Sequence, residues 1–272
     1  MKPVSEITPA QVAGVRYVLT DIDDTLTNSG KLTASAYSAL WKLKKAGFKV
    51  IPVTGRPAGW CDCIVREWPV DGVVGENGAF AFWEDSPSIG APIARLPVLR
   101  EMYHSNAIRN NHPILRKARD KALGEIPGLR EAKDQLFRLF DIALDFAEEE
   151  PVLPLASAEK ARDIALAEGA VAKISSIHVN VWMGNYDKLS MTELFLKARF
   201  GWQGDLGEAL FVGDSPNDEP MFARFPLACA VANIHRCQHL IKHLPAFVAG
   251  SEGGEGFAEI AEVLLEKTKA PA

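Results

Sequence analysis

The chain has few cysteines, and their spacing does not fit a structural metal site. There are four in 272 residues. A single residue separates Cys61 from Cys63, which is not the spacing of a zinc knuckle, and no matching pair follows downstream. We therefore expect four reduced thiols, mostly buried or half-buried, as is usual in a cytoplasmic protein.

Three further features are missing, and each excludes a class of protein. No apolar run approaches the roughly 18 residues that cross a bilayer. The first fourteen residues lack the apolar segment of a secretory signal. Basic residues are not in excess, since 30 Lys and Arg face 35 Asp and Glu, for a net charge of −5. We expect no membrane partner and no nucleic-acid partner.

What is present is an alternation of strand and helix patterns in an ordinary globular composition, 47% hydrophobic and 24% charged. Near-continuous apolar strands are predicted first, and they alternate with amphipathic helices joined by short turns. This order is typical of right-handed parallel crossovers and predicts an α/β fold with a Rossmann-like, doubly wound parallel sheet. The predicted strands span residues 16–20, 48–53, 71–75, 208–212, 227–231 and 247–248, and a helix covers residues 34–46.

The alternation breaks between residues 83 and 187. Helical patterns appear at 114–123 and 158–167, whereas residues 137–146 and 177–183 alternate between apolar and polar side chains. A period of two with one polar face indicates an antiparallel sheet that is covered on one side only. We predict an inserted α+β cap domain at 83–187, which divides the core into 1–82 and 188–272. In the segment 137–146 the side expected to face the helices carries Arg138, Phe140, Ile142, Leu144 and Phe146.

Paired acids follow the first predicted strand. Residues i and i+2 of an extended chain point the same way, so Asp21 and Asp23 share one face. Like charges this close raise the pKa of one group or require a cation between them. Carboxylate oxygens without Cys or His nearby suit a hard cation such as Mg²⁺. The ordinary alternative is a strand followed by an acidic helix cap.

Other chemically distinctive residues follow later strands or the insertion. Ligands of open parallel α/β sheets bind at the carboxyl ends of the strands. Thr54 alone suits a helix cap, Lys188 alone a solvated side chain, and Asp214 with Asp218 an acidic turn. Their occurrence together, in this order, favours one catalytic site at one edge of the sheet.

Four segments together resemble the motifs of the haloacid dehalogenase (HAD) superfamily of phosphohydrolases. They are Asp21–Thr27, Thr54–Pro57, Asp187–Lys188 and Gly213–Asp218. The insertion and Glu76–Ala79 resemble the Cof-like branch with a class II cap of the B subtype. That branch includes sucrose-phosphate, trehalose-phosphate and mannosyl-3-phosphoglycerate phosphatases and cap-bearing phosphomannomutases. Asp24 departs from the commonest pattern, since many members have Gly at this position.

The resemblance implies a role for each core motif. Asp21 is the expected nucleophile, Asp23 the acid and base, and Thr54 the donor of a hydroxyl to a phosphoryl oxygen. Lys188 is expected to supply positive charge to the nucleophile and the phosphoryl group. Mg²⁺ is the implied cofactor, held by a carboxylate oxygen of Asp21 and the backbone carbonyl of Asp23. The implied metal site also includes the carboxylate of Asp214, and Asp218 with Asn217 is expected to lie behind the direct ligands or to contact the metal through water.

Substrate recognition is expected from both parts of the chain. The predicted substrate-binding residues are Thr54, Gly55, Arg56, Asn77, His178 and Asn180. The polar face of the inserted sheet is expected to form the roof of the site, with Trp182 stacking on a sugar ring and Asp141 and Asp145 accepting hydrogen bonds from hydroxyls. The alternative is that this face meets solvent and that Arg56 forms an ordinary salt bridge.

The sequence thus predicts a Mg²⁺-dependent phosphomonoester hydrolase that acts on a sugar phosphate or a similar small metabolite through an aspartyl-phosphate. The partner is a small molecule, and the protein is expected to be a monomer or homodimer. A phosphosugar mutase on the same scaffold and a non-catalytic regulator that kept the fold remain alternatives. A receiver-like domain is disfavoured, because such domains are far shorter and have no place for the insertion.

Overall fold

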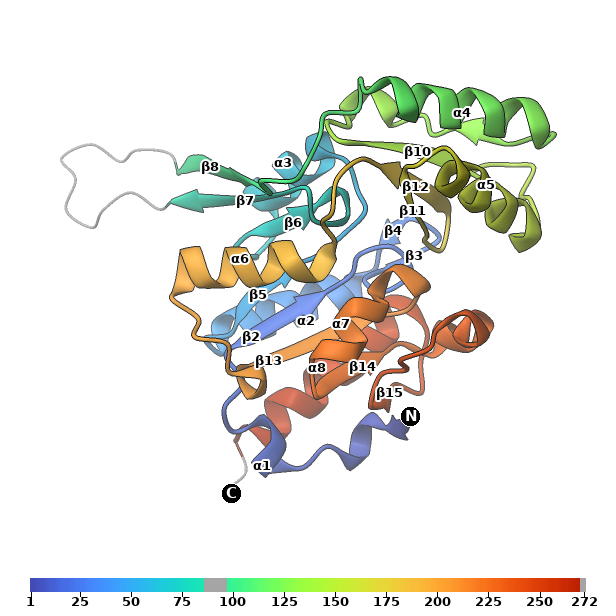
Figure 1. Ribbon diagram of the computed structural model, residues 1–272. Coiled ribbons are helices and arrows are strands. Elements are labelled where there is room, and N and C mark those ends of the chain that lie inside the picture. The colour runs from blue at the N-terminus through green and yellow to red at the C-terminus, as the bar shows by residue number, and fades with distance from the viewer. Residues whose placement is uncertain (86–96, 270–272) are drawn as a thin grey trace.

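A central parallel sheet organises the chain (Figure 1). The computed structural model describes residues 1–85 and 97–269. Strand β2 lies between β13 and β5, and every pairing in this sheet is parallel. The spatial order is β1 (Lys2–Pro3), β15 (Phe247–Val248), β14 (Leu227–Ala230), β13 (Ala209–Gly213), β2 (Tyr17–Thr20) and β5 (Lys49–Pro52).

Helices cover both faces of this sheet (Figure 1). Successive side chains of a strand point to opposite faces, so Val18 packs on one side and Leu19 on the other. The Val18 side is covered by α1 (Pro9–Val12), α2 (Ala34–Lys45) and α8 (Gly253–Lys267). The Leu19 side is covered by α6 (Lys188–Phe200) and α7 (Glu219–Arg224). The predicted doubly wound α/β core is confirmed.

Helix α2 illustrates how local sequence determines these elements. Its N-cap Thr33 accepts a hydrogen bond from the Ala36 backbone N–H at 3.1 Å. Leu40 and Leu43 lie on its buried side. The helix is followed by Gly47 at φ +94°, a left-handed conformation that glycine adopts without steric cost.

The third predicted strand belongs mainly to a different sheet. Strand β6 (Val73–Gly75) pairs antiparallel with β7 (Phe80–Asp85), which pairs antiparallel with β8 (Val98–Tyr103). A single parallel bridge between Val53 and Val74 links β6 to the end of β5. The predicted boundary between residues 82 and 83 therefore falls inside β7. Residues 86–96 of the predicted insertion lie outside the described residues.

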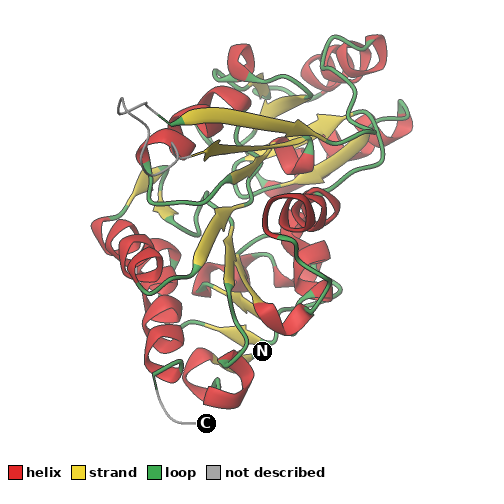
Figure 2. Ribbon diagram, turned by 90° about the vertical axis from the view of Figure 1, so that its left-hand side faces the viewer, coloured by secondary structure: helices red, strands yellow, loops and turns green. Residues whose placement is uncertain are grey.

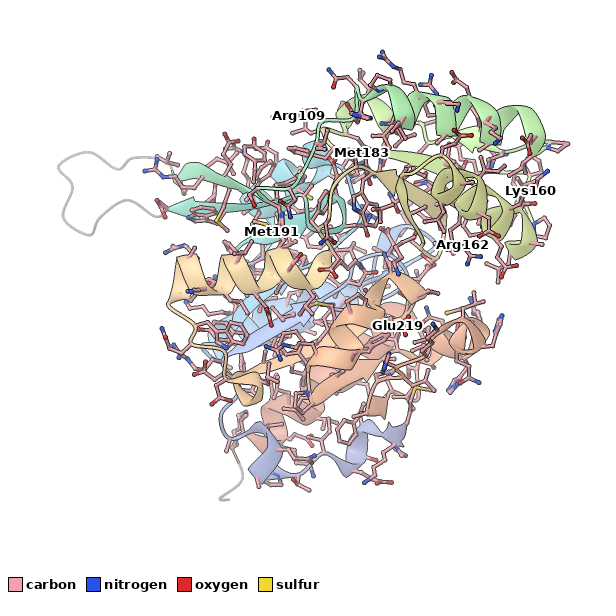
Figure 3. All side chains as sticks on the ribbon, viewed as in Figure 1. Arg109, Lys160, Arg162, Met183, Met191 and Glu219 are labelled. Carbon is pink, nitrogen blue, oxygen red and sulfur yellow. The ribbon has the colours of Figure 1, made fainter. Side chains whose placement is uncertain are left out.

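The inserted segment forms an antiparallel sheet that two helices cover on one side. Its strands lie in the order β11 (Val171–Ile174), β12 (His178–Trp182), β10 (Asp141–Asp145) and β9 (Arg130–Glu131). Helices α4 (Pro113–Glu125) and α5 (Leu155–Ala167) pack on it through an apolar cluster. Lys160 of α5 (Figure 3) donates from Nζ to the carbonyl of Glu125 at the end of α4, at 2.9 Å. The inserted sheet lies above the core sheet in Figure 2. The predicted α+β cap is confirmed as a fold.

The strand predicted at 137–146 is shorter than expected. Residues Gln135–Phe137 form a 3₁₀ turn, and β10 begins at Asp141. Phe140 does not join the helix-covered side but packs with Phe80 and Trp182 on the opposite side of the sheet. The cause is a hydrogen-bonding partner outside the sheet, because the backbone N–H groups of residues 139–141 bond to the carboxylate of Glu76.

The remaining short elements form turns at the edge of the core. Strands β3 (Thr27–Asn28) and β4 (Lys31–Leu32) make a small hairpin. The 3₁₀ turns η2 (Glu76–Gly78) and η5 (Pro216–Asp218) follow β6 and β13. Within residues 1–85 and 97–269, none of the helices combines the length and the apolar character needed to traverse a membrane.

Candidate active site

Three buried carboxylates meet where β2 and β13 end. One oxygen of each of Asp21, Asp214 and Asp218 lies within 4.8 Å of the others. Burial raises the pKa of Asp21 to about 7 and the pKa of Asp214 well above its ordinary value, and the neighbouring carboxylates add to both shifts. A set of oxygen donors with so much unfavourable charge suits a hard divalent cation. The donor set therefore fits Mg²⁺.

Lys188 provides a fixed counter-charge beside these carboxylates. Its Nζ donates to Oδ1 of Asp21 and to Oδ1 of Asp218, both at 2.7 Å, and the side chain is 1% exposed. Burial lowers the pKa of Lys188, but the two carboxylates raise it by more, so it stays above its ordinary value. The lysine opens α6, where the N-cap Asp187 accepts from the Ser190 N–H at 2.7 Å. The cap thus fixes the helix turn that carries the cation.

Asp218 orders the loop that holds Asp214. Its Oδ2 accepts from the backbone N–H of Asp214 at 3.0 Å and of Ser215 at 3.2 Å, while Oδ1 accepts from Lys188. A Cβ on Gly213 would lie 2.4 Å from this Oδ2, so a larger residue at 213 would displace the carboxylate. Both oxygens of Asp218 thus have protein partners, which makes it an organiser of the site as well as a candidate ligand.

Two residues that the sequence did not single out hold Asp214. Thr25 Oγ1 donates to its Oδ1 at 3.2 Å, and Asn233 Nδ2 donates to its Oδ2 at 2.9 Å. Asn233 Nδ2 also donates to the backbone carbonyl of Asp24 at 3.0 Å. Thr25 lies inside a predicted motif, but Asn233 lies in a turn after β14 and had no motif to identify it.

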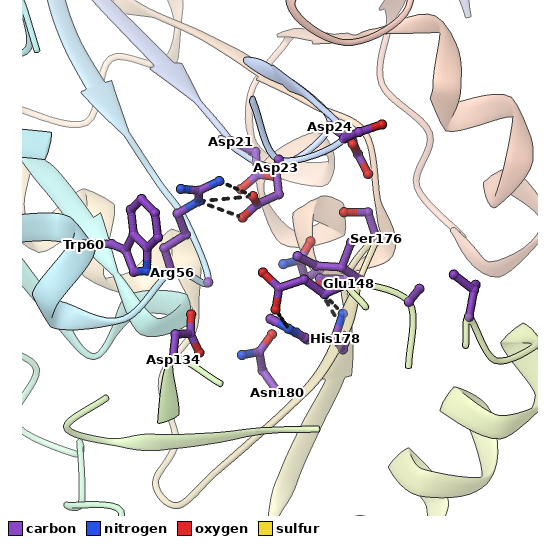
Figure 4. Close-up of a pocket in the computed structure, with 18 of the residues that line it drawn as sticks. Asp21, Asp23, Asp24, Arg56, Trp60, Asp134, Glu148, Ser176, His178 and Asn180 are labelled. Carbon is purple, nitrogen blue, oxygen red and sulfur yellow. Dashed lines mark hydrogen bonds and ion pairs between the residues drawn. The ribbon is translucent and has the colours of Figure 1, made fainter. Parts of the chain in front are cut away.

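Asp23 is separated from the carboxylate trio and faces the pocket beside Arg56. The Arg56 Nε donates to both carboxylate oxygens at 3.1 and 3.2 Å, and Nη2 donates to Oδ1 at 2.7 Å (Figure 4). The guanidinium also lies 4.8 Å from the ring centroid of Trp60. Burial lowers the pKa of Arg56, but the Asp23 carboxylate more than offsets this and the pKa is raised. Arg56 therefore holds Asp23 in place as a cation.

The turn after β5 lies under this pair. Thr54 is fully buried, and its Oγ1 accepts from the Arg56 backbone N–H at 3.0 Å. Asn77 donates its backbone N–H to the Thr54 carbonyl at 3.0 Å, and its Oδ1 accepts from Asn217 Nδ2 at 3.3 Å. The Nδ2 of Asn77 is buried and has no hydrogen-bond partner among residues 1–85 and 97–269. Gly55 lines the pocket between them.

A polar pocket of about 650 Å³ lies between the core and the inserted sheet. Asp21, Asp23 and Arg56 line it from the core. Glu148 and His178 face them from the other side, and His178 Nε2 lies 2.8 Å from Glu148 Oε2 (Figure 4). Of the predicted substrate-binding residues, Gly55, Arg56, His178 and Asn180 line this pocket, whereas Thr54 and Asn77 lie behind its wall.

The predicted roof is wrong in three of its residues. Trp182 is 1% exposed and packs against Tyr186 in an apolar cluster, so it cannot stack on a sugar ring. Asp141 and Asp145 are buried and bonded to Arg138 and Arg130 respectively. The alternation of apolar and polar residues correctly placed His178, Asn180 and Trp182 on one face of the sheet. It did not predict that the pocket ends before Trp182. The aromatic ring on the pocket wall is instead Trp60 of α3 (Ala58–Glu67), which is 47% exposed.

Comparison with known proteins gives the fold and, over part of the chain, a match to one family model. The family model of haloacid dehalogenase-like hydrolases matches residues 18–95. Among curated protein sequences, none matches this chain. The predicted resemblance to HAD hydrolases, from the four motifs, and to the Cof-like branch, from the insertion and Glu76–Ala79, is confirmed.

Solved structures resemble the chain over nearly its full length. A haloacid dehalogenase-like hydrolase from Bacteroides thetaiotaomicron is 16% identical, with a TM-score of 0.60 over 91% of this chain and 98% of its own. A sugar phosphatase of HAD subclass IIB is 14% identical, with a TM-score of 0.58 over 91% and 98%. The sucrose-phosphatase from Synechocystis sp. PCC6803, in complex with sucrose and phosphate, is 15% identical, with a TM-score of 0.57 over 92% and 98%. At these identities the likeness establishes the fold.

Proposed function

We propose that the protein is a Mg²⁺-dependent phosphomonoester hydrolase of the HAD superfamily that acts on a sugar phosphate or a similar small phosphorylated metabolite. One observation carries the proposal. Asp21 lies at the base of a polar pocket with a carboxylate oxygen bonded to the buried Lys188, beside Asp214. A carboxylate that must attack a phosphate monoester needs this positive charge, because otherwise one anion would approach another.

The metal site in this proposal is built from the carboxylates of Asp21, Asp214 and Asp218 together with the backbone carbonyl of Asp23. Bound Mg²⁺ would supply positive charge against the phosphoryl oxygens. Asn233 and Thr25 hold the Asp214 carboxylate in its orientation, which reduces the ordering that binding requires.

The proposed reaction has two steps. An oxygen of Asp21 attacks phosphorus, and the bond from phosphorus to the leaving oxygen breaks. For the first step Asp23 must leave its pair with Arg56 and carry a proton, which it gives to the leaving oxygen. Asp23 then takes a proton from a water molecule whose oxygen attacks the aspartyl-phosphate, which releases phosphate and restores the Asp21 carboxylate. Asp23 faces the pocket, where the leaving group and the water must lie.

We propose that recognition divides between the two parts of the chain. Gly55 and Arg56 line the pocket and would contact the phosphoryl group directly. Thr54 and Asn77 lie behind them, so their predicted contact with the phosphoryl group requires this turn to shift on binding, with Nδ2 of Asn77 as a donor beside Gly55. His178 and Asn180 would contact the leaving alcohol from the inserted sheet. Glu148 joins them, because it lines the pocket and bonds to His178. A sugar is a suitable leaving group for a pocket wall with so many hydrogen-bonding side chains.

The partner in this proposal is a small phosphorylated molecule, and the protein acts as a monomer or homodimer. We propose a cytoplasmic location as well. All four cysteines are free, as expected for thiols in a reducing compartment.

The test is release of inorganic phosphate from a panel of sugar phosphates, with Mg²⁺ and with EDTA. We expect release with Mg²⁺ and loss of release with EDTA. Asp21→Asn should lower the rate by at least about a thousandfold, because it removes the attacking carboxylate. Asp62→Asn, which breaks an exposed ion pair with Arg66 on α3, serves as the matched control and should leave the rate unchanged.

Two outcomes would contradict the proposal. Continued phosphate release by a clean Asp21→Asn preparation would exclude Asp21 as the nucleophile. Movement of the phosphoryl group between hydroxyls of one sugar, with little free phosphate, would favour the mutase alternative.

A further inference from the structure

Glu76 is a fully buried acid that the proposed reaction does not use. Among the described residues its partners are all backbone N–H groups. Oε1 accepts from Ala58 at 3.0 Å and Leu139 at 2.9 Å, and Oε2 accepts from Phe140 at 2.6 Å, Asp141 at 3.2 Å and Leu139 at 3.1 Å. A buried charge is tolerated only when donors surround it in this way. The N–H groups depend in turn on Glu76, since Ala58, Phe140 and Asp141 are buried residues whose donors would lose their acceptor without it.

These donors come from two different parts of the fold. Ala58 is the first residue of α3 in the core. Leu139 to Asp141 lead into β10 of the inserted sheet, and Asp141 lies 65 residues from Glu76 in the chain. One side chain therefore joins the core to the inserted domain, and it does so at the start of β10.

The local backbone directs Glu76 toward the inserted domain at some cost. Glu76 and Asn77 have φ values of +42° and +53°, which residues with a Cβ rarely adopt. The turn also places Gly78 against the start of α6, where a Cβ would lie 2.0 Å from the Asp187 carbonyl oxygen. The orientation of the Glu76 side chain is thus fixed by a tightly packed turn of the core.

Arg138 makes a second tie beside the first. Its side chain is 1% exposed, and Nη1 donates to the Gly55 carbonyl at 2.9 Å and to Asp141 Oδ1 at 3.0 Å. Gly55 precedes Arg56, the residue that holds Asp23. The segment 138–141 is therefore bonded to the turn that carries a proposed catalytic pair.

A short chain of contacts connects this tie to the pocket wall. Asp141 Oδ2 accepts from Asn180 Nδ2 at 2.9 Å. Asn180 lines the pocket, and its Oδ1 lies 3.3 Å from the place that a Cβ on Gly55 would take. Asn180 is thus separated from the Glu76 carboxylate by Asp141 alone.

We infer that Glu76 is a positioning residue that fixes the start of β10, and with it Asn180, against the Gly55–Arg56 turn. The inserted domain is then held to the core on this side of the pocket. Asp24 of the core and Ser176 of the inserted domain face each other at another part of the pocket (Figure 4). The expected effect on KM rests on the proposed function. The attachment of residues 139–141 to Glu76 does not depend on that function.

Amide hydrogen exchange tests the tie without any substrate. Glu76→Gln keeps the side-chain length but turns one acceptor oxygen into an NH₂ group that faces N–H donors. We expect the amides of residues 139–141 to exchange at least about tenfold faster, with unchanged exchange in α4 and α5. Glu168→Gln is the matched control, because it breaks ion pairs to Lys117 and Lys121 within the inserted domain and should leave residues 139–141 protected.

Unchanged protection of 139–141 in Glu76→Gln would overturn the inference, as would a uniform rise in exchange over all elements. If Glu76→Gln does not fold, Glu76→Asp is the second variant, because it keeps the charge but moves it back by one methylene. Faster exchange of the amides of residues 139–141, with unchanged exchange in α4 and α5, would again support the inference, and unchanged exchange at 139–141 would overturn it.

Steady-state kinetics separate positioning from general stability. In Glu76→Gln we expect KM for glucose 6-phosphate to rise about tenfold with little change in kcat, because Asn180 loses its fixed place beside the leaving group. The parameters for p-nitrophenyl phosphate should stay within about twofold, since its flat leaving group does not depend on sugar-hydroxyl contacts. Equal loss for both substrates would contradict the positioning role. No release from either substrate by the unaltered protein would instead count against the proposed function, and hydrogen exchange would still decide the role of Glu76.

Discussion

Asp24 has a backbone conformation that is unfavourable for a residue with a Cβ. It has φ +55°, in the left-handed region that favours glycine, and it lines the pocket mouth. Burial also raises the pKa of its carboxyl group, with the nearby Asp23 charge adding to the shift. The glycine that many HAD members have at this place is the residue that such a backbone prefers.

Asp24→Gly should therefore stabilise the protein. Relief of the strained backbone and removal of a partly buried carboxylate are expected to add about 1 kcal/mol, or about 2 °C in Tm by calorimetry. Ser29→Gly is the matched control, because Ser29 has φ +48° but is exposed, so it reports the backbone effect alone. A lower Tm for Asp24→Gly would mean that the carboxylate makes a favourable contact across the pocket mouth.

At the residue scale, the sequence predicts the site residues that belong to motifs, but not those whose contacts are to residues far away in the chain. Asp21, Lys188 and Asp214 follow or begin regular elements, and the parallel sheet brings such positions to one edge. Asn233 and Glu148 lie in irregular segments, and their contacts depend on loop paths that no periodic pattern encodes. The roles of the predicted site residues stay predictions.

The turn η2 shows what a single glycine does for neighbouring elements. Gly78 has φ +105°, and its missing side chain lets the start of α6 approach, with the Asp187 carbonyl oxygen 2.0 Å from where a Cβ would be. Because Asp187 caps the helix that presents Lys188, the packing of this turn also sets the position of the cation.

Gly78→Ala should destabilise the protein by about 3 kcal/mol, because strain and a backbone clash coincide, and Tm should fall by roughly 8 °C. Gly124→Ala is the control. Gly124 lies in α4, and nothing lies within 4 Å of the place that its Cβ would take, so alanine there should leave stability unchanged or raise it by up to about 1 kcal/mol. Equal Tm values for the two variants would show that the turn relaxes without cost.

At the element scale, period and capping predicted most helices and strands, and the exceptions have identifiable causes. The strand expected at 137–146 begins late because Glu76 takes the N–H groups of three of its residues. The strand at 71–75 reads as a member of the parallel sheet but pairs mainly with β7, since pairing depends on partners that a local pattern does not contain.

At the scale of the whole molecule, metal and protons should compete for the same site. Burial raises the pKa of Asp21 to about 7 and that of Asp214 well above its ordinary value. Without metal, the folded chain holds these protons more tightly than the unfolded chain. This contribution to stability is therefore present at low pH and is lost as the pH rises through about 7. Mg²⁺ binds the ionised carboxylates, so its contribution grows over the same range.

We expect the rise in Tm caused by excess Mg²⁺ to be larger at about pH 8 than at about pH 6, as measured by thermal unfolding with and without EDTA. Asp214→Asn should abolish most of the rise. A gain that is equal at both pH values, or larger at the lower one, would argue against a metal site built from these carboxylates.

The placement of β2 has a consequence for the order in which the protein is made. β2 pairs with β13, and Thr25 meets Asp214 across 189 residues of chain. At roughly 5 to 20 residues per second of synthesis, the first acids leave the ribosome about 10 to 40 seconds before their partners. The carboxylate trio cannot assemble until Asp218 has emerged, so the nascent chain carries Asp21 without the rest of its site while the whole inserted domain is synthesised.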